Sequence, residues 1–286
     1  TGLRQARPEP VEGLSPNGGN LSDNPTSPIL LFDSGVGGLS VLAELRKVLP
    51  QAPVIYAADM AGLPYGTKTE AQVAARVAGL LGRMSERYRP RLACIACNTA
   101  STIALGMVRE VLEIPVVGTV PAIKPAAALT QTGVIGLLGT EATVRQRYVD
   151  QLEREFAADK VLIRHAAPGL VTVAEAKLRG HAVDMADVRA AVAGLLDHPR
   201  APAVDTVVLA CTHFPLLRDE LAALLGPQVQ LIDGAQGIAR RIAALTEGQA
   251  FARAMPDLAV TTGSLDSFEA LLPQLQAFGL DRIAKF

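Results

Sequence analysis

Short apolar segments alternate with longer amphipathic segments along most of the chain. The apolar segments have the length of buried strands, and they occupy residues 29–32, 54–57, 91–96, 116–118, 134–138, 161–164 and 206–210. Between them, apolar residues recur at helical spacing, as Val73, Val77, Leu80 and Met84 do. This alternation is typical of parallel sheets with crossover helices. The sequence therefore predicts an α/β fold.

The pattern also predicts how the chain divides. It breaks after Pro121, and late strands are expected near residues 230–232 and 258–261. We therefore expect two α/β lobes with mainly parallel sheets, the first made of residues 29–120 plus 232–286 and the second of residues 121–231. Residues 1–28 are rich in proline and glycine and lack apolar periodicity, so we expect a disordered extension there that carries no chemistry.

Composition narrows the class of protein. Of the 286 residues, 49% are hydrophobic and 19% are charged, which is usual for a soluble globular protein. The formal net charge is −1 and no cluster of Lys and Arg is interleaved with aromatic residues, so we expect a small-molecule partner and no nucleic acid. No apolar stretch approaches the roughly 18 residues of a membrane span, and no leader pattern opens the sequence. We expect no membrane partner and a cytoplasmic location, where the three cysteines stay thiols.

Two of the apolar segments end in the same way, with Ala-Cys at the tip of the expected strand. Cys97 closes residues 91–96, Cys211 closes residues 206–210, and an apolar helical pattern follows each. Ligand sites of α/β sheets lie at the carboxyl ends of the strands. A helix N-terminus there is expected to lower the pKa of a thiol and to hold anions. The pattern suggests proton transfer on both sides of one small anionic substrate.

Polar residues follow each of these cysteines at once, as Asn98-Thr99 and as Thr212-His213. Amide and hydroxyl groups are neutral donors for carboxylates, and a histidine can exchange a proton near physiological pH. A cysteine is also often a small buried hydrophobic residue. Cys94 fits that description, because it lies within a strand and alternation turns it to the face opposite Cys97.

A metal site is the sharpest alternative. Cys94-x-x-Cys97 together with Cys211-x-His213 could supply four ligands for zinc. Structural zinc sites usually have their Cys-x-x-Cys on a turn, whereas the two residues between these cysteines continue a strand pattern. A redox pair would need both thiols near a helix N-terminus, and Cys94 comes too early for that.

The turn after the first expected strand has two readings. Glycines at residues 35, 37 and 38 suggest a dinucleotide-binding loop, but Ser40 stands where the fingerprint requires its third glycine. The pair Asp33-Ser34 at the strand tip is more informative, because it directs a carboxylate and a hydroxyl toward the expected ligand crevice. Asp33 can also simply cap the following helix.

Taken together, the motifs resemble those of bacterial glutamate racemases in the aspartate/glutamate racemase superfamily. The likeness runs from Ile29 to the C-terminus. It is carried by DSGVGGLS at residues 33–40, PYG at 64–66, ACNTAS at 96–101, VGTVPA at 117–122 and ACTHFPLL at 210–217. The resemblance implies two pseudo-symmetric, doubly wound lobes with the active site in the cleft between them, and an enzyme that needs no cofactor and no metal.

The resemblance also assigns roles to individual residues. One cysteine removes the α-proton as a thiolate while the other delivers a proton to the opposite face. Cys97 would act on the D-enantiomer with the help of Asp33, and Cys211 on the L-enantiomer with the help of His213. Glu175 resembles the family's glutamate on the second side of the site. The substrate-holding positions would be Ser34, Tyr65, Gly66, Asn98, Thr99, Thr140 and Thr212.

These assignments lead to a functional expectation with alternatives. The expected function is interconversion of L- and D-glutamate, supplying D-glutamate for peptidoglycan and so for cell-wall biogenesis and cell shape; a homodimer is left open. Racemisation of aspartate or another α-substituted acid remains an alternative in the same superfamily. So does a decarboxylase that uses one cysteine, although the presence of both cysteines argues against it. A zinc-stabilised binding module for a small molecule is the alternative from a different class.

Overall fold

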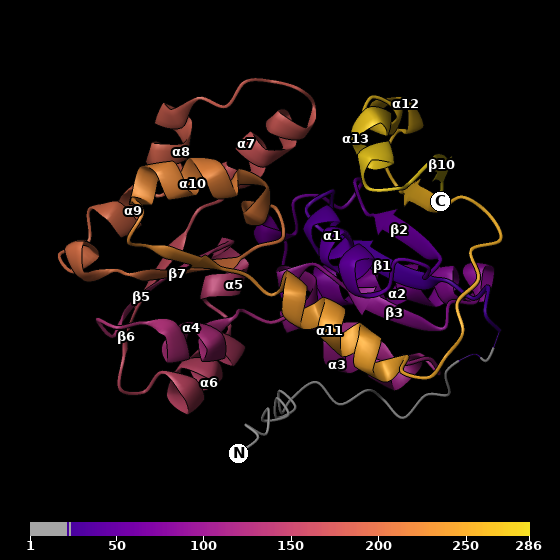
Figure 1. The fold of residues 1–286 in the computed structure, drawn as a ribbon, viewed down its shortest axis with the longest axis horizontal. Coiled ribbons are helices and arrows are strands. Elements are labelled where there is room, and N and C mark those ends of the chain that lie inside the picture. Colours follow the sequence, from indigo (N-terminus) through magenta and orange to yellow (C-terminus); the bar gives the residue numbers. More distant parts are fainter. Residues whose placement is uncertain (1–21, 23) are drawn as a thin grey trace, which may run out of the picture.

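Two sheets with helices on both faces form two lobes that lie side by side (Figure 1). The structure is a computed structural model, and it describes residue 22 and residues 24–286. Most of the extension expected over residues 1–28 lies outside these described residues. Its last part is tied to the first lobe, because the Arg91 guanidinium donates hydrogen bonds to the carbonyl oxygens of Asn24 and Ser27.

The first lobe contains a six-stranded sheet in the order β10-β9-β2-β1-β3-β4, in which all pairs are parallel. Its strands are β1 Ile29–Asp33, β2 Val54–Ala58, β3 Leu92–Ile95, β4 Val116–Gly118, β9 Leu258–Thr261 and β10 Arg282–Lys285. The four strands at its centre, β1, β2, β3 and β9, are almost entirely buried. The predicted C-terminal return to the first sheet is present as β9 and β10.

Helices cover both faces of this sheet. One face packs α1 Leu39–Val48, α11 Ala235–Leu245, α12 Leu265–Glu269 and α13 Leu272–Ala277. The other face packs α2 Glu70–Tyr88 and α3 Asn98–Val111, with the short 3₁₀ helix η1 Tyr65–Thr67 before them. Thr69 and Gln72 form a capping box at the start of α2, which satisfies backbone groups that the helix leaves unpaired.

The second lobe contains a four-stranded parallel sheet in the order β6-β5-β7-β8. Its strands are β5 Val134–Gly139, β6 Val161–Ala166, β7 Thr206–Ala210 and β8 Gln230–Ile232. One face packs α7 Gly169–Leu178, α8 Met185–Ala191, α9 Ala193–Leu196, η3 Phe214–Leu217 and α10 Arg218–Leu225, with η2 Ala201–Ala203 before β7. The other face packs α4 Ile123–Leu129, α5 Glu141–Val144 and α6 Arg147–Phe156.

The two sheets repeat one topology. In both, the first strand of the unit lies between the second and the third, and the fourth follows the third: β2-β1-β3-β4 and β6-β5-β7-β8. Cys97 follows β3 and Cys211 follows β7, which are the third strands of the two units. The predicted pseudo-symmetric α/β architecture is therefore confirmed, and the two cysteines occupy equivalent places in it.

Some local expectations differ from the structure. The amphipathic segment that ends before residues 206–210 is divided into two helices, α8 and α9, that meet at Val192. The segment after Cys211 opens with a 3₁₀ turn containing Pro215 before α10 begins, because a proline has no N–H for a continuous α-helix. The predicted lobe boundaries, which fall between β4 and α4 and inside β8, remain predictions. No helix in the described part of the chain is long and apolar enough to cross a membrane.

Candidate active site

The two lobes meet at the carboxyl ends of their strands, and both cysteines lie there. Cys97 is the N-cap of α3 and is 5% exposed, and Cys211 is 7% exposed. The Ser40 hydroxyl in the first lobe donates a hydrogen bond to the Thr212 carbonyl in the second at 3.2 Å. A negative charge on Cys211 would raise the pKa of the Cys97 thiol.

Cys97 is linked to Asp33 through Ser34. The Ser34 hydroxyl donates to Asp33 Oδ1 at 3.1 Å and lies 3.5 Å from the Cys97 sulfur. Because its own proton goes to Asp33, this hydroxyl can accept a hydrogen bond from the Cys97 thiol. Asp33 is fully buried, and its Oδ2 has no hydrogen-bond partner among the described residues. The three side chains come from the adjacent strands β1 and β3 or the turns directly after them, so one lobe holds them all.

The electrostatics of Cys97 differ from the expectation. Burial, followed by the charge of Asp33, raises the pKa of the Cys97 thiol to about 12. The Ser34 hydroxyl and the Ala100 N–H at the start of α3 lower that pKa by less. The lowering expected from a helix N-terminus is present, through the Ala100 N–H, but it is the smaller effect. Removal from water and a like charge outweigh the helix, and Cys97 is held as a thiol.

Cys211 has a cation as its partner. His213 Nδ1 lies 3.9 Å from the Cys211 sulfur, and His213 Nε2 lies 2.9 Å from Glu175 Oε1. Burial alone would lower the pKa of His213, but its hydrogen bonds to Cys211 and Glu175 outweigh burial and raise the pKa to about 10. His213 is therefore an imidazolium at neutral pH. An imidazolium beside a sulfur stabilises a thiolate.

Three threonine hydroxyls join the lobes at one edge of the site. The Thr99 hydroxyl lies 3.0 Å from that of Thr140 and 3.1 Å from that of Thr143, which are themselves 3.0 Å apart. Thr99 is on α3 in the first lobe, whereas Thr140 and Thr143 begin and line α5 in the second. Thr99 and Thr140 were expected here, and Thr143 was not. Thr140 is the N-cap of α5 and its hydroxyl accepts a hydrogen bond from the Thr143 N–H. The three-residue spacing of a capped helix is therefore the signal that could have found Thr143.

The segment that contains Tyr65 and Gly66 approaches the same edge. The Tyr65 hydroxyl donates to Asp59 at 2.5 Å, and burial together with the Asp59 charge raises the pKa of Tyr65. Its hydroxyl is thus committed to Asp59. A Cβ on Gly66 would lie 3.0 Å from Thr140 Cβ, so the absence of a side chain there permits the close approach of the two lobes.

The remaining predicted positions lie beside the cysteines. Asn98 and Thr212 are 7% and 6% exposed and directly follow Cys97 and Cys211. A Cβ on Gly37 would lie 2.6 Å from Thr212 Oγ1, so the turn after β1 presses against the second lobe at a glycine. The structure thus brings together all twelve site residues expected from the sequence: Cys97, Cys211, Asp33, His213, Glu175, Ser34, Tyr65, Gly66, Asn98, Thr99, Thr140 and Thr212.

Two buried residues near the site escaped sequence reasoning. The Tyr56 hydroxyl donates to the Gly35 carbonyl at 2.9 Å and so supports the turn that holds Ser34. Asp59 accepts hydrogen bonds from Tyr65, Arg76 and Thr262. Both polar side chains are in or directly after the apolar strand β2, and their partners cannot be read from local pattern.

The four residues of the alternative zinc site are not arranged as one set. Cys94 packs into the core between the sheet and α1, whereas Cys97 packs into the core under α2 and α3. The two cysteines therefore lie on opposite faces of the sheet and cannot bind one ion together. Within residue 22 and residues 24–286, no cluster of three or more His, Cys, Asp or Glu side chains could hold a metal ion.

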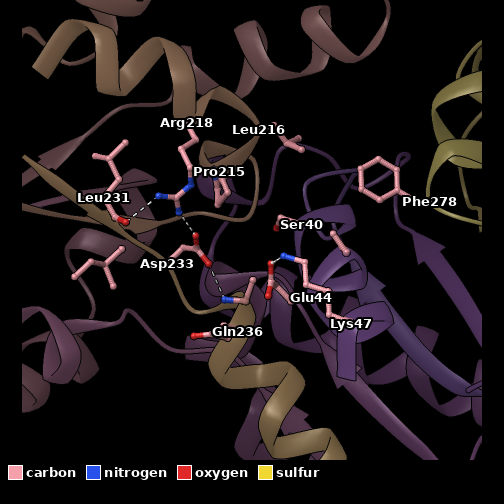
Figure 2. Close-up of a pocket in the computed structure, with 13 residues that line it drawn as sticks. Ser40, Glu44, Lys47, Pro215, Leu216, Arg218, Leu231, Asp233, Gln236 and Phe278 are labelled. Carbon is pink, nitrogen blue, oxygen red and sulfur yellow. Dashed lines mark hydrogen bonds and ion pairs between the residues drawn. The ribbon is translucent and has the colours of Figure 1, made fainter. Parts of the chain in front are cut away.

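A cavity of about 560 Å³ lies next to this site but does not include the cysteines (Figure 2). It opens between α1 of the first lobe and the η3–α10 and β8–α11 segments. Its walls contain two ion pairs, Arg218 with Asp233 and Lys47 with Glu44. Ser40 borders the cavity and also bonds the residue after Cys211. The cysteines are instead enclosed where the lobes touch.

Known proteins share this sequence and arrangement. A family model described as Asp/Glu/hydantoin racemase matches residues 39–242. The glutamate racemase of Sphingopyxis alaskensis is 63% identical over 260 residues, covering 91% of this chain and 97% of that protein. The crystal structure of Escherichia coli glutamate racemase with L-glutamate and the activator UDP-MurNAc-Ala has a TM-score of 0.85 at 43% identity, covering 91% of this chain and 98% of that one. Glutamate racemase RacE1 of Bacillus anthracis has a TM-score of 0.78 at 29% identity, covering 92% and 98%.

Proposed function

Since this chain belongs to the Asp/Glu/hydantoin racemase family and is an amino-acid racemase, we propose that it interconverts L- and D-glutamate with two cysteines and no cofactor. One observation carries the proposal. Cys97 and Cys211 occupy equivalent positions in two pseudo-symmetric units and are both buried where the lobes meet. Their surroundings differ in charge, because a carboxylate lies behind Cys97, through Ser34, and His213 lies beside Cys211.

In the direction from L to D, Cys211 is the base. With His213 as an imidazolium beside it, its thiolate takes the α-hydrogen as a proton, so an S–H bond forms as the C–H bond breaks. The electron pair stays on the α-carbon and is delocalised into the carboxylate. The Cys97 thiol then gives its proton to the opposite face and is left as a thiolate, to which Ser34 can donate a hydrogen bond.

In the direction from D to L, the two sulfurs exchange roles. The Cys97 thiolate takes the proton, and the Cys211 thiol delivers one to the other face. Asp33 assists the first sulfur through Ser34, and His213 assists the second. Glu175 contacts His213 at 2.9 Å, so we assign it a positioning role through that ring.

Neutral groups hold the substrate in this proposal. The Ser34, Thr99, Thr140 and Thr212 hydroxyls and the Asn98 amide are donors that can bind carboxylates of either mirror image. Because the Tyr65 hydroxyl bonds Asp59, we assign the contribution of this segment to the backbone N–H groups of Tyr65 and Gly66. Preorganised donors in an enclosed, water-poor site also stabilise the carbanion that forms.

Substrate entry requires the lobes to separate. Both cysteines are less than a tenth exposed, and the direct contacts between Thr99 and Thr140 close one edge of the site. We therefore propose that opening and closing of the lobes gates each turnover. We assign the product to the cytoplasmic supply of D-glutamate for peptidoglycan.

The test is racemisation in deuterated water with L-glutamate and no added cofactor. We expect D-glutamate that contains deuterium at the α-carbon. Cys97→Ser and Cys211→Ser should each lower the rate about 10³-fold, because a hydroxyl is a far weaker base than a thiolate. Cys94→Ala is the matched control and should keep the parental rate, since Cys94 faces the opposite side of the sheet.

Racemisation at the parental rate by either serine variant would disprove the two-cysteine mechanism. Turnover of aspartate in place of glutamate would assign the chain to the related activity. Stoichiometric zinc, together with ligand binding that survives Cys97→Ala without any turnover, would support a binding module.

A further inference from the structure

Helix α7 is fastened to both lobes at its C-terminal end. In the second lobe, the Lys177 ammonium donates to the Leu216 carbonyl at 2.9 Å and pairs with Glu220 at 2.7 Å. The next residue, Leu178, packs against the core of the first lobe. In Figure 1, α7 is the part of the second lobe that faces α12 and α13. The position of the C-terminal end of α7 therefore depends on contacts with both lobes.

Arg179, directly after α7, makes one contact with each lobe. Its Nη1 donates to the Ser267 carbonyl on α12 of the first lobe at 3.2 Å. Its Nη2 lies 3.8 Å from Glu175 Oε2 in the second lobe. The other oxygen of the same carboxylate, Oε1, contacts His213 Nε2. A continuous series of polar contacts therefore runs from the first lobe through Arg179 and Glu175 to the partner of Cys211.

We propose that Arg179 is a positioning residue that aligns the Glu175–His213 pair only while α12 of the first lobe lies against it. This inference rests on the proposed two-cysteine function. The planar guanidinium has fixed donor directions, so one acceptor in each lobe fixes its orientation. When the lobes separate, the Ser267 carbonyl moves away, and Glu175 regains rotational freedom. The Glu175–His213 pair beside Cys211 is therefore aligned only when the two lobes close.

The other half of the site has no such dependence. Cys97, Ser34 and Asp33 all belong to the first lobe, on adjacent strands and their turns. Loss of Arg179 should therefore slow proton transfer at Cys211 and leave transfer at Cys97 unchanged. The effect should be modest, because Arg179 is 31% exposed and exposed pairs are weak.

Isotope effects can locate this change, whereas rates alone cannot. L- and D-glutamate have equal free energies, so any variant must lower kcat/KM equally in both directions. For Arg179→Gln we expect a two- to fivefold loss, of the order set by an exposed ion pair. The primary isotope effect on α-deuterated L-glutamate should rise, because removal of that hydrogen by Cys211 limits the rate more. The isotope effect on α-deuterated D-glutamate should fall, because the later step at Cys211 then limits the rate.

Two further variants serve as controls. Arg145→Gln removes an Arg–Glu pair of the same i,i+4 spacing, 3.9 Å apart with Arg145 78% exposed, and should leave both isotope effects unchanged. Arg179→Lys keeps a cation near Glu175 but loses the fork, so its isotope effects should lie between those of the parental protein and Arg179→Gln. Thermal unfolding of each variant verifies that it is folded.

The outcomes separate this inference from the proposed function. If the parental protein does not racemise glutamate, the proposed function is wrong. If it does, and Arg179→Gln has parental isotope effects or shifts both in the same direction, the positioning role alone is wrong. Opposite shifts that Arg179→Lys partly restores would establish it.

Discussion

The two halves of the site differ in charge although their backbones are equivalent. Cys97 faces a carboxylate through Ser34, and burial with that negative charge raises the pKa of its thiol to about 12. Cys211 faces His213, whose pKa of about 10 makes it a cation at neutral pH. Repetition of a fold therefore places two sulfurs alike without giving them the same chemistry.

The substitution with the largest expected effect on this comparison is His213→Asn. Without the imidazolium, Cys211 loses the charge that stabilises its thiolate, and we expect kcat/KM to fall about 100-fold. The isotope effect on α-deuterated L-glutamate should rise and that on the D-enantiomer should fall. Parental activity should decline as the pH rises through about 10, where His213 loses its proton, and the variant should lack this limb. A variant with the parental pH profile would show that His213 does not cause the alkaline limb.

A second test removes the hydroxyl between Cys97 and Asp33. Ser34→Ala should lower kcat/KM about tenfold, the size expected for a lost hydrogen bond to a charged group. Because Ser34 serves Cys97, the isotope effects should move in the opposite sense from those of His213→Asn, rising for the D-enantiomer. Kinetic isotope measurements on both enantiomers check this. If the isotope effects of Ser34→Ala and His213→Asn change in the same direction, Ser34 and His213 do not serve different cysteines.

The smallest effect concerns Glu175. Glu175→Gln should lower kcat/KM about fivefold by weakening one hydrogen bond to a charged ring. That bond raises the pKa of His213, so the alkaline limb of the activity profile should move to lower pH. An alkaline limb that stays in place would mean that Glu175 does not set the pKa of His213.

Glu175→Gln should also change how the free energy of unfolding depends on pH. His213 has a higher pKa in the folded protein than its ordinary value of 6.5, so it contributes stability that is fully present below that value. This contribution is lost as the pH rises through about 10. In Glu175→Gln the loss should occur at lower pH, which denaturant unfolding from pH 6 to 10.5 can measure.

Local pattern predicted the elements and the places of the cysteines, and long-range contacts had to come from the structure. The apolar segments before Cys97 and Cys211 identified β3 and β7. Nothing in the sequence pairs Glu175 with His213, because such a contact depends on how α7 packs. For the same reason, burial of Cys97 and its effect on the thiol pKa could not be predicted from a helix N-terminus alone.

The three threonine hydroxyls that join α3 to α5 suit a contact that, in the proposed mechanism, breaks in every catalytic cycle. Each is neutral and can act as donor or acceptor. Solvent molecules or a carboxylate oxygen can therefore replace any one of them at little cost in free energy. An ion pair in the same place would lock the lobes or compete with an anionic guest. Hydroxyl groups that can exchange partners instead allow a substrate carboxylate to take over these hydrogen bonds and so to hold the two lobes together.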